Sequence, residues 1–187
     1  MLSLSDEINS MNFSTQPTLE DENIKLIPLW EDDFERLFEV ASDPKIWELH
    51  PNKNRYQREI FETFFKGAIE SKGAFLVIKK ASEEIAGSTR FYHYNEEDNS
   101  IFIGYTFYAT KFWGKKINAV AKRLMLDYIF QFVEKVNFHV GAENYRSQKA
   151  MEKLGAIKKD EIVVAYYGEP DRLNFQYEIK KEDWLNQ

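Results

Sequence analysis

The sequence lacks cysteine, so none of its 187 residues can form a disulfide bond or a thiolate metal site. This absence is typical of a cytoplasmic protein, which is the location we expect. The sequence also lacks an apolar run long enough to cross a membrane and an N-terminal signal peptide, so we expect no membrane partner. Because His50 and His139 have no carboxylate or cysteine partner at ligand spacing, no metal site is predicted.

Basic residues are absent from the first 22 positions, which hold five acidic residues. This segment carries −5 of the net charge of −6, so the remaining chain carries only −1. Such a balance argues against nucleic acid as a partner. The segment is polar, shows no helical or strand periodicity and contains Pro17. We therefore predict a mobile acidic tail over residues 1–22 and a single domain over residues 23–187.

Hydrophobic residues make up 43% of the sequence and aromatic residues 16%, which is enough for one substantial core. Apolar periodicity predicts strands at 23–29, 74–79, 85–94, 100–109, 136–140, 161–167 and 173–180. It predicts helices at 31–42, 57–71, 117–133 and 144–154. Short loops favour an antiparallel meander over 74–109, and the helix that follows favours a parallel crossover to the next strand. The predicted fold class is α/β (α+β), a mixed and mostly antiparallel central sheet with helices on both faces.

A short glycine turn opens the most regular predicted helix at Trp113–Asn118, with the letters WGKKIN. Unpaired backbone N–H groups and the helix dipole make such a helix start attractive to anions. First helical turns normally favour acidic residues, yet Lys115 and Lys116 lie here, with Lys111 just upstream. The arrangement predicts a phosphate-bearing ligand. The alternative is a tight turn whose lysines are only solvated.

A second polar helix start follows the strand at 136–140. Asn144 is in the position of a helix cap, Ser147 lies in the first turn, and Gly155 is in the position of a C-terminal cap. Capping alone explains Asn144, and serine is ordinary in a first turn. Taken with the glycine turn, the two polar side chains at one helix mouth indicate a ligand site more specifically than either motif does alone.

These motifs resemble those of GNAT-fold N-acetyltransferases, in the branch similar to ribosomal-protein N-terminal acetyltransferases. Ile103–Phe107 resembles the fourth strand of that family, and Trp113–Asn118 resembles its pyrophosphate loop. Asn144–Ser147 with Leu154–Ala156 resembles its coenzyme A helix. The order of elements is also similar, so the resemblance covers roughly residues 23–180.

The resemblance implies acetyl-CoA as the acyl donor. Backbone groups of Tyr105, Thr106 and Phe107 would pair with the pantetheine arm, and Asn144 would bind the pantetheine region. Ser147 would lie close to the sulfur and stabilise the departing thiolate. The pyrophosphate would be held by the loop and first helical turn, comprising Trp113, Gly114, Lys115, Lys116, Ile117, Asn118 and Ala119.

The sequence departs from the family pattern in its loop and at two positions that handle protons. Lys116 and Asn118 replace residues that are small in the family loop. Relatives often carry a glutamate at Phe102, which activates the amine through water, and a tyrosine at Met151, which serves as general acid. Because neither Phe102 nor Met151 can transfer a proton, another polar group is needed. The candidates, in falling order, are Tyr105, Glu143, His93 and Arg90.

The leading hypothesis is therefore an acetyl-CoA-dependent N-acetyltransferase acting on a primary amine, in a small molecule or at a protein N-terminus, by direct transfer. A second hypothesis is a coenzyme-A-binding sensor or scaffold without catalysis, which the apolar Phe102 favours. In a third, the loop lysines and Asn144 only stabilise the fold. The sequence does not choose the acceptor, and pairing of two chains through the last hairpin is one arrangement that it allows.

Overall fold

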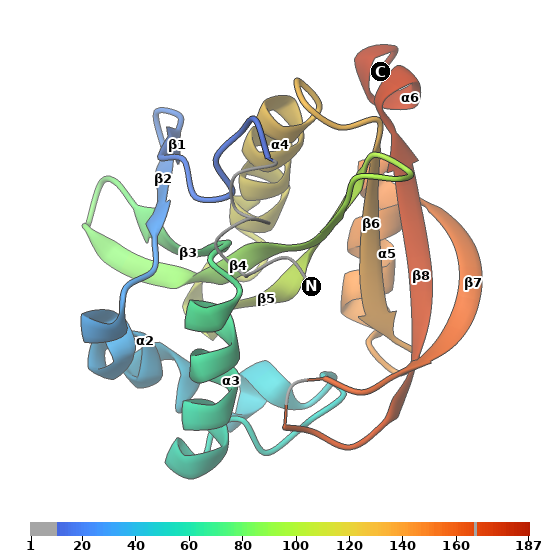
Figure 1. The fold of residues 1–187 in the computed structure, drawn as a ribbon. Helices are drawn as coiled ribbons and strands as arrows, with labels where there is room; N and C mark the ends of the chain where they lie inside the picture. Colours follow the sequence, from blue (N-terminus) through green and yellow to red (C-terminus); the bar gives the residue numbers. More distant parts are fainter. Residues whose placement is uncertain (1–10, 167) are drawn as a thin grey trace.

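The computed structural model describes residues 11–166 and 168–187, which form one twisted eight-stranded sheet with helices on both faces (Figure 1). The strand order is β1-β2-β3-β4-β5-β6-β8-β7. The strands are β1 (Leu19–Glu20), β2 (Ile24–Pro28), β3 (Ala74–Lys79), β4 (Glu84–Asn95), β5 (Ser100–Tyr108), β6 (Lys135–Gly141), β7 (Ile157–Val164) and β8 (Arg172–Lys180). Every neighbouring pair is antiparallel except β5 and β6. The fold class predicted from the sequence is confirmed.

The helices divide the core into two layers, one on each side of the sheet. The α-helices are α2 (Phe34–Ala41), α3 (Arg58–Glu70), α4 (Ile117–Ile129), α5 (Tyr145–Leu154) and α6 (Lys181–Leu185). Short 3-10 turns are η1 (Glu31–Asp33), η2 (Pro44–Trp47) and η3 (Thr110–Phe112). The buried faces of α4 and α5 pack in one core cluster, and those of α2 and α3 pack in the other. Figure 1 shows α2 and α3 side by side and well separated from α5.

Two irregularities in the middle of the sheet position the site. Strands β5 and β6 pair over only three residues each, and the last pair is Phe102 with Asn137. Strand β6 pairs with its other neighbour, β8, along its whole length. Beyond the pair of Phe102 and Asn137 it no longer pairs with β5, so β5 and β6 diverge. Strand β5 also carries a bulge against β4, because Arg90 pairs with Gly104 but Ser88 pairs with Phe107.

The side chains of β5 alternate between the two faces of the sheet, so residues of this strand pack in both core layers. Ile101 and Ile103 are fully buried on the α4 side, whereas Phe107 is buried on the α3 side. A regular strand would place Ile103 and Phe107 on the same face, since they are four residues apart. The extra residue in the bulge reverses the alternation. One face of the sheet at this point therefore belongs to α4 and α5, and the other, which we call the α3 face, belongs to α2 and α3.

The predicted mobile tail is wrong from Phe13 onward. The ring of Phe13 packs 5.1 Å from Phe132 and 5.2 Å from Tyr94, measured between ring centroids. The side chains of Thr15 and Gln16 donate hydrogen bonds to the backbone carbonyls of residues 72 and 74. Strand β1 then extends the sheet. Aromatic packing and backbone pairing offset the ordering cost that a polar, aperiodic sequence suggested. Residues 1–10 lie outside the described residues.

Three element boundaries differ from the predictions. Helix α4 ends at Ile129 rather than Val133, because the buried residues Phe130 and Val133 lie in a turn that leads to β6. Strand β7 spans 157–164 rather than 161–167, since its long pairing with β8 starts directly after Gly155. Tyr167 lies outside the described residues. The short helix α6 was not predicted.

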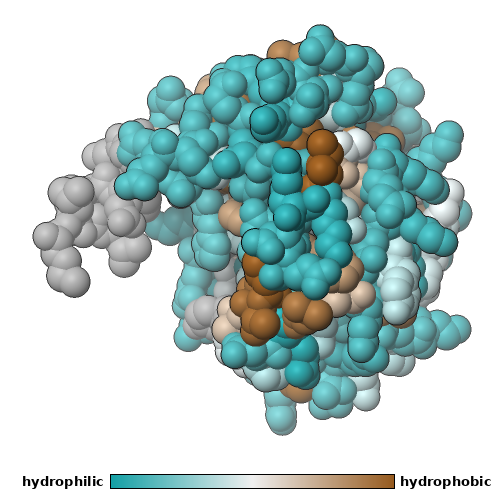
Figure 2. Space-filling view, turned by 90° about the vertical axis from the view of Figure 1, so that its right-hand side faces the viewer, coloured by the Kyte–Doolittle hydropathy of each residue, from teal (hydrophilic) through white to brown (hydrophobic). Residues whose placement is uncertain are grey.

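The side of the molecule formed by β7 and β8 is mainly hydrophilic, with some hydrophobic side chains gathered near its centre (Figure 2). Exposed apolar residues of these two strands are Ile157, Val163 and Leu173. Among the helices that the structure describes, none has the length and apolar character needed to cross a membrane.

Candidate functional site

The glycine turn predicted as an anion site leads directly into α4, on the α4 side of the gap between β5 and β6. Lys116 is the residue before the helix and has a left-handed backbone, with φ +61°. Gly114 is also left-handed, and a side chain there would meet nothing within 4 Å. No described residue caps the helix through its side chain, and its first turn holds no acidic residue. The first N–H groups of α4 are thus available to an anion.

The three lysines near this turn have different surroundings. Lys111 is ion-paired with Glu84, a partner from β4 that the sequence analysis did not foresee. The Lys115 side chain lies 5.7 Å from the ring centroid of Phe112. Both Lys115 and Lys116 are exposed. A phosphate group at the start of α4 would therefore meet Lys115 and Lys116, whereas Lys111 already has a carboxylate partner.

A polar group that the sequence analysis missed lies beneath the bulge of β5. Lys122, on α4, is buried and donates hydrogen bonds to Thr106 Oγ1 at 2.8 Å and Thr89 Oγ1 at 3.1 Å. Desolvation lowers the pKa of Lys122 to about 7. One helical turn earlier, the Oδ1 atom of Asn118 is buried and has no hydrogen-bond partner among the described residues. This orphaned acceptor lies in the first turn of α4, where the resemblance places a ligand.

Tyr105 lies at the bulge with φ +52°, an unusual conformation for a bulky residue. Its ring lies on the α3 face, with the guanidinium of Arg90 3.7 Å from its centroid and the ring of Tyr166 at 5.3 Å. Desolvation raises the pKa of Tyr105, so its hydroxyl stays protonated at neutral pH. Because β6 diverges beyond Phe102, the ladder does not pair Tyr105, Thr106 or Phe107 with β6. This stretch is the one expected to hold an extended pantetheine arm.

Helix α5 begins across the β5–β6 gap from the start of α4, on the same face of the sheet. The Oδ1 atom of Asn144 accepts a hydrogen bond from the backbone N–H of Ser147 at 3.2 Å, which confirms the predicted cap. Ser147 is half-buried at this helix mouth. Gly155 closes the helix with φ +84°, also as predicted. Glu143 is different, because its side chain is 78% exposed and 3.7 Å from Lys53. The structure therefore gives Glu143 a surface ion pair rather than a place beside Tyr105.

The turn before α4 and the first turn of α5 are in contact through a cation–π interaction. The guanidinium of Arg146, on α5, lies 3.6 Å from the ring centroid of Trp113, in the glycine turn. The indole of Trp113 donates a hydrogen bond to the backbone carbonyl of Tyr108 at 3.0 Å. The contact joins two motifs that are 33 positions apart in sequence. Trp113 and Arg146 therefore hold the two predicted ligand loops at a common opening.

Phe102 and Met151, the two apolar replacements, lie in hydrophobic surroundings. The ring of Phe102 packs 5.3 Å from Tyr92 and 4.5 Å from His139, measured between ring centroids. Met151 is only 4% exposed and belongs to the core between α5 and the sheet. Neither side chain has a group that could donate or accept a proton. Of the remaining candidates, His93 is exposed with φ +49°, and Arg90 is buried.

A buried ion pair joins two loops across the α3 face. Arg55 donates to both carboxylate oxygens of Glu169, at 2.7 and 2.6 Å, and both side chains are at most 6% exposed. Arg55 lies in the loop before α3, whereas Glu169 lies in the connection between β7 and β8. Arg90 lies close to this pair, and no described carboxylate forms an ion pair with it. Desolvation lowers the pKa of Arg90 to about 10, so it remains charged at neutral pH.

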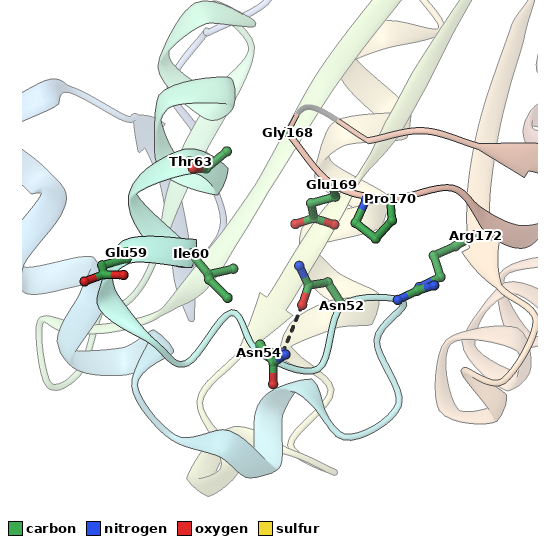
Figure 3. Close-up of a pocket in the computed structure, with 9 residues that line it drawn as sticks. All are labelled: Asn52, Asn54, Glu59, Ile60, Thr63, Gly168, Glu169, Pro170 and Arg172. Atoms are coloured by element: carbon green, nitrogen blue, oxygen red, sulfur yellow. Dashed lines mark hydrogen bonds between the residues drawn. The ribbon is translucent and has the colours of Figure 1, made fainter.

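A pocket of about 350 Å³ lies outside this ion pair (Figure 3). Glu59, Ile60 and Thr63 line it from α3. Asn52 and Asn54 line it from the preceding loop, and Gly168, Glu169, Pro170 and Arg172 line it from the β7–β8 side. Figure 3 shows Glu169 and Pro170 above Asn52, across the pocket from Ile60 and Thr63 of α3. Six of these nine lining residues are polar or charged, and they include both signs of charge.

Two further unpaired acceptor atoms lie on β6, at the point where the sheet opens. Asn137 Oδ1 and His139 Nε2 are buried and have no hydrogen-bond partner among the described residues. The two residues are two positions apart on one strand, so their side chains share a face. His139 packs on Phe102, so that face is the one shared with Tyr92. The sequence analysis treated His139 as isolated, because the contact with Phe102 joins different strands.

Comparisons with known proteins were made for both sequence and structure. The family model described as acetyltransferase (GNAT) domain matches residues 23–157. A comparison with curated proteins found no match. A GCN5-related N-acetyltransferase from Brucella melitensis is 20% identical with a TM-score of 0.77, covering 93% of this chain and 85% of that one.

Two further structural neighbours come from Vibrio species. Spermidine N-acetyltransferase from Vibrio cholerae, in complex with CoA and spermine, is 18% identical with a TM-score of 0.68, covering 89% of this chain and 100% of that one. Ribosomal-protein-S5-alanine acetyltransferase from Vibrio fischeri is 16% identical with a TM-score of 0.67, covering 90% of this chain and 99% of that one. At these identities the likeness is one of fold.

Proposed function

Because this chain belongs to the GNAT acetyltransferase family, we propose that it transfers an acetyl group from acetyl-CoA directly to a primary amine. The observation that carries the proposal is the gap between β5 and β6, which opens beyond Phe102 and Asn137. The uncapped start of α4 and the mouth of α5 flank the gap on one side of the sheet. A polar pocket lies on the other side. Such a gap lets a donor and an acceptor approach one another from opposite faces.

The residues present fit a coenzyme A thioester. The first N–H groups of α4, with Lys115 and Lys116, offer positive charge for a pyrophosphate. The orphaned Oδ1 atom of Asn118 would accept a hydrogen bond from an incoming donor group. The unpaired backbone of β5 from Tyr105 to Phe107 offers donors and acceptors to an extended amide chain.

The acetyl group would be transferred near Tyr105 and Ser147. The protonated hydroxyl of Tyr105 could donate to the leaving sulfur. In our proposal Ser147 stabilises the departing thiolate from the mouth of α5. The proposed acceptor site lies on the α3 face, between the loop before α3 and the β7–β8 connection. Since one neighbour is a spermidine acetyltransferase and another a ribosomal-protein-alanine acetyltransferase, both polyamines and peptide N-termini belong in the test.

Two measurements test the proposal. Calorimetric titration with acetyl-CoA should show saturable binding, and a thiol assay should show CoA release with spermidine, a blocked lysine or a peptide with a free N-terminus. Binding without release for any amine would favour the alternative, a coenzyme A sensor. Absence of binding at millimolar acetyl-CoA would contradict both functions.

A matched pair of glycine variants tests the coenzyme loop. Gly114→Val and Gly155→Val both place a branched side chain at a left-handed position, with φ +74° and +84°. Each should cost stability by about 1–2 kcal/mol. Only Gly114→Val should weaken acetyl-CoA binding, because Gly155 lies at the far end of α5 from the proposed site. Equal acetyl-CoA affinity in both variants would contradict the assignment of the loop.

A further inference from the structure

A lysine occupies a core position of α4, where the helical pattern favours an apolar side chain. Lys122 is 3% exposed and lies one turn after Asn118 and one turn before Leu126 on the same side of the helix. Burying a polar or charged group costs free energy unless hydrogen bonds compensate it. The amine donates to Thr106 Oγ1 of β5 at 2.8 Å and to Thr89 Oγ1 of β4 at 3.1 Å. The buried amine therefore makes one bond to each of two neighbouring strands.

The two threonines lie on opposite strands of the bulge in the β4–β5 ladder. Between the flanking pairs of the ladder, Thr89 alone faces two residues of β5, Tyr105 and Thr106. The hydroxyls of Thr89 and Thr106 are 2.8 Å apart and hydrogen-bonded to each other. We call this bond and the two bonds from Lys122 the bulge clamp. The bulge clamp joins the two strands at the point where their backbone ladder is interrupted.

The bulge clamp is complete in only one register of β5. Because side chains alternate along a strand, a shift by one residue exchanges the side chains that face the two sides of the sheet. Thr106 faces α4, where it accepts from Lys122. The Tyr105 ring lies on the α3 face, against Arg90 and Tyr166. A shift by one would turn Thr106 away from α4 and break its bond with Lys122, so the bulge clamp favours the register in which Tyr105 faces the proposed acceptor side.

This part of β5 has little backbone pairing to fix its register. Its pairing with β6 ends at Phe102, so from Ile103 onward its one ladder neighbour among the described strands is β4. The bulge interrupts that remaining ladder, and Tyr105 has a left-handed backbone with φ +52°. A residue in such a conformation keeps it only where the surrounding structure enforces it. The bulge clamp provides this constraint from the α4 side.

We propose that Lys122 is a positioning residue, which through the bulge clamp holds the Tyr105 ring and the backbone from Tyr105 to Phe107 in the arrangement that acetyl transfer needs. The link with the reaction rests on the acetyl transfer proposed above, whereas the bulge clamp itself does not. Lys122 contacts neither donor nor acceptor and acts only through β5. Both protonation states suit this role, because an ammonium group has three N–H donors and a neutral amine still has two.

Hydrogen exchange of Lys122→Met at pH 7 tests the bulge clamp without any ligand. Methionine is of similar length and apolar, but it donates no hydrogen bond. Backbone amides of β5 from Ile103 to Tyr108 should exchange about tenfold faster than in the wild type, because the bulge opens more often. Amides of β3 should exchange no faster, since the substitution removes a desolvated amine and keeps the packing. Faster exchange in both strands would mean that Lys122 contributes only to global stability, and would overturn the proposal.

A matched pair of threonine variants separates the hydroxyl from the packing of the side chain. Thr89 is fully buried on β4, so neither variant alters an exposed group. Thr89→Val keeps the branched shape and removes the hydroxyl, whereas Thr89→Ser keeps the hydroxyl and removes a methyl group. The β5 amides of Thr89→Val should exchange as fast as those of Lys122→Met, and those of Thr89→Ser should stay close to the wild type. The reverse order would mean that packing holds the bulge, and the proposal would be wrong.

Calorimetry and kinetics connect the bulge clamp with the reaction. In Lys122→Met and Thr89→Val, the Kd for acetyl-CoA should rise about tenfold, because the backbone edge of β5 is no longer held in one arrangement before binding. The kcat with an amine that the wild type acetylates should also fall, since the Tyr105 ring is held less firmly in place. Thr89→Ser should keep wild-type values of both. Lys45→Met, the same chemical change at an exposed lysine, is the control and should leave both unchanged.

The outcomes separate the positioning role from the proposed function. Faster exchange in β5 together with weaker acetyl-CoA binding supports the proposal. Unchanged exchange overturns it. Faster exchange with wild-type Kd and kcat also overturns it, because the bulge clamp would then have no effect on the site. Failure of the wild-type protein to bind acetyl-CoA would contradict the transferase function and with it the positioning role, while the exchange rates would still show whether Lys122 holds the bulge.

Discussion

At the scale of single residues, the site contains side chains in conformations or surroundings that cost free energy. Lys116 and Tyr105 have left-handed backbones, and Lys122 is a cation buried without a carboxylate among the described residues. Such features persist only where the surrounding structure enforces them. Tyr105 lies on β5, Lys116 directly precedes α4, and Lys122 lies in the second turn of α4 against Thr106 of β5. The cost is thus concentrated at the gap where the donor is expected to bind.

The strain at Lys116 predicts an unusual effect of glycine. Lys116→Gly should relieve the left-handed backbone, whereas Lys115→Gly makes the same chemical change at a neighbouring residue that is not left-handed. The two variants should differ by about 1–2 kcal/mol in unfolding free energy, with Lys116→Gly the more stable. Urea denaturation measures the difference. Equal stability of the two variants would show that Lys116 carries no backbone strain.

The buried amine of Lys122 predicts a pH-dependent stability. Its pKa is about 7 in the folded protein, against an ordinary 10.5. Between these values the unfolded chain binds more protons, so the contribution of Lys122 to stability rises with pH. Lys122→Met removes this dependence and leaves Thr89 and Thr106 bonded to each other at 2.8 Å.

Lys122→Met should therefore stabilise the protein most at pH 6 to 7. This advantage should shrink by up to about 1.4 kcal/mol per pH unit as the pH rises toward 10. Urea titrations at several pH values measure it. The exposed Lys45→Met serves as the control and should show no such trend. An advantage for Lys122→Met that stayed constant with pH would mean that Lys122 keeps an ordinary affinity for protons.

At the scale of elements, the proposed acceptor side is formed by α3 and two segments without regular structure. The loop before α3 and the β7–β8 connection meet through Arg55 and Glu169, which are 114 residues apart. Figure 1 shows the β7–β8 connection extending away from its strands toward the start of α3. The loop before α3 also carries Pro51, whose carbonyl accepts a hydrogen bond from Arg172 at 3.1 Å. Glu169 and Arg172, which make these contacts, both line the pocket.

The burial of the Arg55–Glu169 ion pair determines how much the loss of one partner changes the stability of the fold. Glu169→Gln leaves Arg55 buried without a charged partner and should cost about 3–5 kcal/mol of stability, less whatever opening of the loops recovers. Glu35→Gln is a matched control, since Arg58 and Glu35 form the same bidentate geometry on the surface. Its loss should be far smaller, because solvent screens the charges. Denaturant unfolding of both variants compares them, and losses of similar size would contradict the argument.

At the scale of the whole molecule, the N-terminal segment ties distant elements together. Phe13 joins β4 to the turn after α4, and Tyr128 on α4 donates a hydrogen bond to the carbonyl of Ser14 at 2.8 Å. Leu19 and Glu20 continue the sheet as β1. The domain therefore begins before residue 23, where the apolar periodicity suggested.

Removing the anchor of this segment should destabilise the whole domain. Phe13→Ala deletes a half-buried ring between two aromatic neighbours and should cost about 1–3 kcal/mol. Leu185→Ala, at a side chain that is 69% exposed, provides the control and should be close to neutral. Thermal unfolding measures both. If Phe13→Ala unfolded at the wild-type temperature, the segment would contribute nothing to stability.

The sequence by itself determined most of the elements and indicated the proposed donor half of the site. Apolar periodicity located the strands and the larger helices, since local spacing records which side of an element is buried. The glycine turn, Asn144 and Gly155 were recognisable because capping and turn chemistry act within a few residues. The replacement of the family's glutamate by Phe102 was also visible in the sequence, but the group that would handle the proton instead was not.

Only the tertiary structure showed which residues come together in the proposed acceptor half. The bulge at Tyr105 depends on how β5 pairs with β4, and the ion pair of Arg55 with Glu169 joins loops that no local pattern relates. Whether His139 Nε2 is buried without a partner depends on three neighbouring strands at once. Burial and hydrogen-bond satisfaction are properties of the packed chain, because they depend on residues that are distant in sequence.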